Sequence, residues 1–150
     1  MIGHIPDHAA SFMGLFARLE NVLRRNGYAK MSRPRAEIDW VQFAKELDEA
    51  FFNDVHYAQE AATLISEPPR IYYRDRGMQP EVQEPIRDVV DLFLRGVCQV
   101  RNNIVHGEKY VDLATPRDDA LVKGAHWVLE QAIARHRKAK EFLATQEVAK

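Results

Sequence analysis

The segment from Ile86 to Ile104 is the feature that most limits what this chain can fold into. Its apolar residues follow a 3–4 spacing, at Ile86, Val89, Val90, Phe93, Val97, Val100 and Ile104. At about 100° per residue, this spacing places them on one stripe of an α-helix, which must be buried against other elements. We expect the helix to end near His106, because Gly107 is the residue type favoured just beyond a helix end.

Helical spacing also occurs nearer the amino terminus. A first helix is expected to bury Phe12, Leu15, Leu19 and Val22, with Gly27 as its stop. A second helix is expected to begin near Trp40 and to extend through Phe51, or as far as Ile65 if nothing interrupts it. The two are joined by a basic connection, residues 24–35.

The last helix is expected to open at the sequence TPRD, residues 115–118. Thr115 is a suitable N-cap, Pro116 suits the first turn, and the Asp118 carboxylate suits the positive end of the helix dipole. Its apolar positions are Leu121, Val122, Ala125, Val128, Leu129, Ala132 and Ile133. No segment alternates as a β-strand would, so we predict an all-α fold: an antiparallel bundle of four or five helices, forming one domain over residues 1–150.

Composition limits the function classes that remain open. The 46% hydrophobic and 29% charged residues are typical of a globular protein, and the net charge of −1 gives no general attraction to nucleic acid. A single cysteine, Cys98, excludes an internal disulfide and suits a reducing compartment. Neither a secretory signal nor an apolar stretch long enough for a membrane span is evident, so we expect a cytoplasmic protein without membrane association.

The stretch RNNIVHG, residues 101–107, clusters polar groups at the expected helix end. Arg101 lies roughly 70° from the centre of the apolar stripe, where a charge is costly unless a partner or cleft is present. On a continuous helix His106 would point roughly 140° away from Arg101. Either the helix stops near His106 and the imidazole turns back, or a symmetric dimer joins the helix ends of two subunits.

This stretch resembles the R-x4-6-H signature of HEPN domains, in which Asn commonly follows the Arg. The resemblance implies an all-α bundle and a metal-independent endoribonuclease, working as a homodimer with a composite active site and often paired with an antitoxin or acting in antiviral defence. By this resemblance Arg101 and His106 are the catalytic pair, and Asn102 helps to orient it. A toxin subgroup carries a modified Tyr two residues after the His, whereas this chain has Glu108 there and Tyr110 two residues later.

Two connections are candidates for RNA binding. Arg24 and Arg25 begin the basic connection, and residues 66–85 contain four of the seven prolines, which excludes a continuous helix. That second connection also holds Arg70, Tyr72, Tyr73, Arg74 and Arg76. Arginine pairs with phosphate and aromatic rings stack on unpaired bases, so this composition suits single-stranded RNA, although solvated loops would have it too.

We therefore expect a ribonuclease that needs no cofactor or metal, because the sequence has no His, Cys, Asp and Glu cluster at metal-ligand spacing. His106 would act as acid or base and Arg101 would stabilise charge on the phosphate, with the substrate 2′-hydroxyl as nucleophile. Two alternatives remain open: a non-catalytic module that binds RNA or a protein partner, and a structural helical subunit of a dimer.

Overall fold

A computed structural model describes residues 6–30, 37–73, 77–78, 83–106 and 115–148. These residues are mainly helical, as the sequence predicts. The longest helices are α1 (Asp7–Arg25), α7 (Pro116–Arg135) and α8 (Arg137–Val148). Shorter helices are α2 (Trp40–Lys45), α3 (Glu49–Tyr57), α4 (Ala62–Ser66), α5 (Val89–Asp91) and α6 (Cys98–His106).

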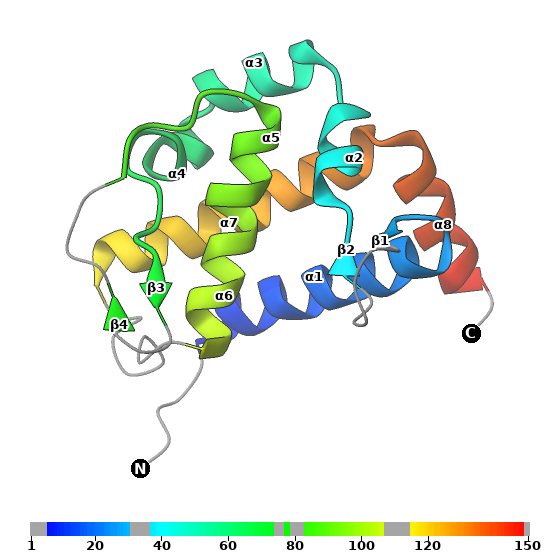
Figure 1. Ribbon diagram of the computed structural model, residues 1–150, viewed down its shortest axis with the longest axis horizontal. Coiled ribbons are helices and arrows are strands. Elements are labelled where there is room, and N and C mark those ends of the chain that lie inside the picture. Colours follow the sequence, from blue (N-terminus) through cyan, green and yellow to red (C-terminus); the bar gives the residue numbers. More distant parts are fainter. Residues whose placement is uncertain (1–5, 31–36, 74–76, 79–82, 107–114, 149–150) are drawn as a thin grey trace.

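Helices α1 and α7 pack along each other and run in the same direction (Figure 1). Near their starts, His8 Nε2 lies 3.0 Å from Asp119 Oδ1. Just beyond their ends, the rings of Tyr28 and His136 are 6.0 Å apart. The expectation of an antiparallel bundle is therefore wrong for this pair. Short loops impose antiparallel neighbours, but α1 and α7 are separated by most of the chain, so nothing local sets their relative direction.

The predicted helix over 86–106 crosses α1 and α7 (Figure 1). It begins as α5 at Val89, where the Asp88 side chain caps it, and passes through a π-helical segment, Leu92–Val97, into α6. Ile86 precedes the helix, but it is buried and its N–H donates to the Ile65 carbonyl at 2.8 Å. The wider π turns rotate the side-chain directions of α6 relative to those of α5. A projection of the sequence on an ideal α-helix does not include this rotation.

The predicted second helix is divided into α2, α3, a 3₁₀ turn (Gln59–Ala61) and α4. The first break lies at Asp48, whose carboxylate accepts the Phe51 N–H at 2.8 Å and so starts α3 as an N-cap. Breaking the helix lets aromatic side chains of α2 reach the crossing helix: the Trp40 and Phe93 rings stack with centroids 6.0 Å apart. Packing thus outweighs the helical pattern that runs through these residues.

Two short antiparallel ladders correct the expectation that no strand is present. Strand β1 (Ala29–Lys30) pairs with β2 (Glu37–Ile38), and β3 (Tyr72–Tyr73) pairs with β4 (Gly77–Met78). Two residues are too few to produce an alternating pattern, so the sequence could not reveal them. The expectation for 115–118 is confirmed, since Thr115 Oγ1 accepts the Asp118 N–H at 3.1 Å at the start of α7.

Candidate functional site

Arg101 and Asn102 lie side by side in the last two turns of α6, as the sequence predicts. The half-buried Arg101 guanidinium lies over the Phe16 ring of α1, 5.5 Å from its centroid. Its Nη1 donates a hydrogen bond to Asn102 Oδ1 at 3.2 Å, and Asn102 is exposed. The aromatic face offsets part of the cost of desolvating the cation, and the neighbouring amide orients it.

His106 is the last described residue of α6, and Gly107, the predicted stop, lies outside the described part of the structure. Because the backbone is helical from Arg101 through His106, the two positions lie about 140° apart around the helix. The His106 side chain is outside the described part of the structure, as are Glu108 and Tyr110. The described part of the chain therefore does not bring the two predicted catalytic groups together.

Asn103 is a buried residue of the same stretch that the sequence did not single out. Its Nδ2 donates to the Arg70 carbonyl at 2.9 Å, and its Oδ1 accepts a hydrogen bond from Gln99 Nε2 at 2.8 Å. Residues 67–71 connect α4 to β3 without helix or strand structure, and we call this segment the strap. Asn103 thus ties the strap to α6, and no local pattern could have revealed a contact between residues so far apart in the chain.

Arg70 is brought beside α6 by this contact, and β3 also packs on α6 (Figure 1). Arg70 is half-buried, and within the described residues its buried Nε has no hydrogen-bond partner. The backbones of Tyr72 and Tyr73 form β3, but their side chains, together with Arg74 and Arg76, lie outside the described part of the chain. The structure therefore locates the predicted RNA-binding connection next to the motif helix and describes one of its arginines in full.

Arg24 and Arg25 occupy a different surface. Both are exposed in the last turn of α1, where Arg24 lies 4.0 Å from Glu20. Arg101 instead contacts Phe16, which lies more than two turns before Arg24 in α1. Roughly 12 Å of helix therefore separates Phe16 from Arg24. The structure does not join this arginine pair to the motif.

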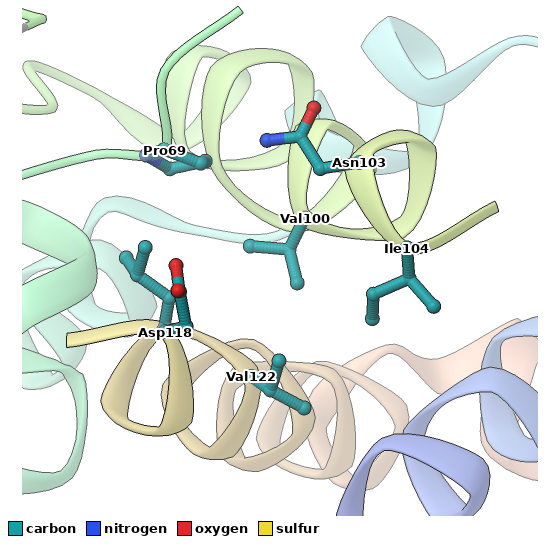
Figure 2. Close-up of a pocket in the computed structure, with 7 residues that line it drawn as sticks. Pro69, Val100, Asn103, Ile104, Asp118 and Val122 are labelled. Carbon is teal, nitrogen blue, oxygen red and sulfur yellow. The ribbon is translucent and has the colours of Figure 1, made fainter. Parts of the chain in front are cut away.

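A small cavity lies on the inner side of α6, lined by Pro69, Val100, Asn103, Ile104, Asp118, Leu121 and Val122. Figure 2 shows Val100 and Ile104 pointing toward α7, where Val122 faces them, while the Asn103 amide lies on the side of the strap. Its volume of about 20 Å³ has room for about one water molecule. A nucleotide is too large to enter this cavity.

The thiol nearest to the motif is a poor candidate nucleophile. Burial raises the pKa of Cys98 to about 12, with nearby Arg101 lowering it only in part. A thiol with this pKa is protonated near neutrality, and the thiolate is the reactive form. Cys98 packs against the core as a small apolar residue.

A second cluster of titratable groups lies at the corner between α7 and α8. Buried His136 places its Nε2 2.9 Å from Glu46 Oε1, and its Nδ1 accepts the Ala139 N–H at 3.1 Å. Because Nδ1 is an acceptor, Nε2 carries the proton and donates to Glu46. The Tyr28 hydroxyl also donates to Glu46 Oε1, and Lys138 Nζ lies 3.7 Å from its other oxygen.

These contacts shift two pKa values in opposite directions. Desolvation raises the pKa of Tyr28 well above its usual range, and the Glu46 carboxylate adds to the increase. Burial also acts to raise the pKa of Glu46, but hydrogen bonds from Tyr28 and His136 and the charge of Lys138 outweigh it, so the net pKa is lowered. Each polar group of this corner has a partner that supports the fold, and His136 caps α8.

The comparisons with known proteins give no family for this chain. No protein-family model matches it, and no curated protein or solved structure matches it significantly. Among residues 6–30, 37–73, 77–78, 83–106 and 115–148, no helix combines the length and apolar character that a bilayer crossing requires. In those same ranges, no three His, Cys, Asp or Glu side chains gather as they would around a metal ion.

Proposed function

We propose that this chain is a metal-independent endoribonuclease of the HEPN type. The observation that carries the proposal is the hydrogen-bonded Arg101–Asn102 pair in the last two turns of α6, on the same helix as His106, with Asn102 exposed to solvent. Arg101 would stabilise charge developing on the scissile phosphate, with Asn102 holding its guanidinium. His106 would assist proton transfer to or from the 2′-hydroxyl nucleophile and the leaving oxygen.

The active site is proposed to be shared between two subunits. On the continuous helix α6, the positions of Arg101 and His106 lie about 140° apart, which a two-fold dimer can reconcile by pairing each Arg101 with the other subunit's His106 position. Mixing Arg101→Ala and His106→Ala subunits tests this arrangement. Heterodimers would regain one complete site, so we expect roughly a quarter of wild-type activity after random mixing. No recovery, or a monomer in light scattering at micromolar concentration, would contradict a shared site.

RNA would bind along the strap and the β3–β4 ladder beside α6. Arg70 is a described cation of this surface, and Tyr72, Tyr73, Arg74 and Arg76 complete the proposed RNA-binding set. Arg24 and Arg25 would add a second, separate contact for a longer RNA. In the cell, such a nuclease would fit a toxin–antitoxin or antiviral system, with an antitoxin protein as its partner.

A ribonuclease assay on mixed RNA is the direct test. Arg101→Ala and His106→Ala should each abolish cleavage while the helical circular dichroism stays unchanged. Matched controls are Arg137→Ala, whose side chain is 91% exposed on α8, and His56→Ala, which is exposed on α3. Full activity in either motif variant would refute the proposal.

One observation favours the structural alternative, in which the motif serves the fold or a dimer. The Arg101 guanidinium already contacts Phe16 and Asn102, so it has partners without any substrate. Under that alternative, Arg101→Ala would lower the melting temperature or dissociate the dimer, and the wild type would not cleave RNA. The same variants therefore separate the two functions.

A further inference from the structure

The strap has no regular secondary structure, so its backbone carbonyls need partners from other elements. Arg117 Nη2, from α7, donates to the Glu67 carbonyl at 3.0 Å and to the Pro68 carbonyl at 2.9 Å. Asn103, from α6, donates to the Arg70 carbonyl at 2.9 Å. Side chains from two helices thus hold the strap at three of its residues.

The Asn103 amide is itself fixed in one orientation. Its oxygen accepts from Gln99, one turn earlier in α6, and its nitrogen donates to the strap. Asn103 is 5% exposed, so water offers its amide few alternative partners. Because the oxygen and the nitrogen of this buried amide are both hydrogen-bonded, the amide holds the backbone at Arg70 in one position.

Arg70 carries an unused donor at this point. Its Nε is buried, and the described residues provide no acceptor for it. An unpaired buried donor is costly, and a guanidinium binds phosphate with parallel N–H donors. We propose that Asn103 is a positioning residue of the site: it fixes the backbone at Arg70 so that this guanidinium is presented to an RNA phosphate. The proposal rests on the proposed RNA-binding function.

The place of Asn103 on α6 limits this role to binding. Asn103 follows Arg101 by two residues, so it lies about 160° away around the helix, on the side opposite the contact between Arg101 and Phe16. Arg70 therefore belongs to a different side of α6 from the charge-stabilising arginine. Losing Asn103 should weaken RNA binding and raise KM, while kcat at saturating RNA stays within about twofold.

A proteolysis experiment without RNA tests whether Asn103 fixes the backbone at Arg70. The bond that trypsin cuts after Arg70 contains the carbonyl that Asn103 holds. Asn103→Ala should speed native-state cleavage at Arg70–Ile71 about tenfold, as expected when one hydrogen bond that opposes local opening is lost. Asn102→Ala is the matched control, because Asn102 is exposed and none of its described contacts involves the strap. Trypsin should therefore cut this variant after Arg70 at the wild-type rate.

An RNA-binding experiment tests whether the Arg70 guanidinium, positioned by Asn103, binds an RNA phosphate. Binding of a 2′-O-methylated single-stranded RNA, which has no free 2′-hydroxyl and so cannot be cut by that route, is measured across a salt series. Arg70→Ala should weaken binding about tenfold and reduce the salt slope by about 0.7, the loss of one phosphate contact. Asn103→Ala should do nearly the same, and the double variant should be no weaker than Arg70→Ala alone, because both changes remove one contact.

The outcomes separate this proposal from the function on which it rests. Faster trypsin cleavage with unchanged RNA affinity would make Asn103 purely structural and overturn the proposal, as would unchanged trypsin cleavage. Wild-type protein that binds no RNA would refute the proposed function itself. If Asn103→Ala does not fold, Gln99→Ala removes only the bond that orients the amide, and it should give smaller changes in the same directions.

Discussion

Two regions of this protein concentrate polar side chains, and they use them differently. At the corner between α7 and α8, Tyr28 and His136 both donate hydrogen bonds to Glu46, and His136 also accepts one from the start of α8. At the end of α6, Asn102 is exposed and the Arg70 Nε has no partner within the described residues. A buried cluster of titratable groups is therefore not by itself evidence of a functional site, because at this corner the polar groups already have partners within the protein.

The largest expected effect concerns the chemistry at the end of α6. A single 2′-deoxy substitution at the scissile position should block cleavage, because the proposed nucleophile is the substrate's own 2′-hydroxyl. Cleavage should persist in EDTA and leave 2′,3′-cyclic phosphate and 5′-hydroxyl ends, which mass spectrometry of the products distinguishes. Dependence on magnesium or 5′-phosphate products would contradict this route even if Arg101 and His106 proved essential.

The next effect should appear at the corner, and in stability rather than activity. His136→Ala removes a buried ring, the hydrogen bond to Glu46 and the cap of α8, so we expect a loss of about 3 kcal/mol in unfolding free energy. For a chain of this size that corresponds to a fall of about 6–12 °C in Tm. Cleavage per folded molecule should stay at wild type. His56→Ala, at an exposed position, should change stability by less than about 0.5 kcal/mol.

A smaller effect is expected from charge removal in the connection that contains the strap. Changing Arg70, Arg74 and Arg76 together to Ala should lower the salt slope of single-stranded RNA binding by up to about 2, at about 0.7 per lost phosphate contact. The matched pair Arg24→Ala and Arg25→Ala should affect long RNAs more than short ones, because these side chains lie on a different surface. An unchanged slope in the triple variant would show that this connection does not touch RNA.

The smallest effect is the pH dependence contributed by the corner. The pKa of Glu46 is lowered on folding, so its stabilisation is present above its unfolded pKa and is lost as pH falls through the folded value. Tyr28 has a raised pKa, so its contribution is present below its unfolded pKa near 10 and is lost at higher pH. Urea unfolding between pH 3 and 7 should show a shallower acid decline in Glu46→Gln than in the wild type. Equal slopes would contradict the inferred role of Glu46.

Much of the local structure could be predicted because its causes are local. Periodic apolar residues predicted a helix through Ile104, and Thr115 with Pro116 indicated the start of α7. These signals act within a few residues, where side-chain spacing and capping hydrogen bonds are set by the helix itself. The same reasoning placed Arg101, Asn102 and His106 together at the end of one helix.

The sequence by itself determined the helical class and the position of the RNNIVH stretch at a helix end. Only the tertiary structure decided that α1 and α7 run parallel, that Asp48 interrupts the second predicted helix, and that a π-helical segment sets the phase of α6. It also decided that Asn103 meets the strap at Arg70, 33 residues away in the chain. The physical reason is that periodicity reports which face of an element is apolar, whereas the faces that meet depend on packing between residues distant in the chain.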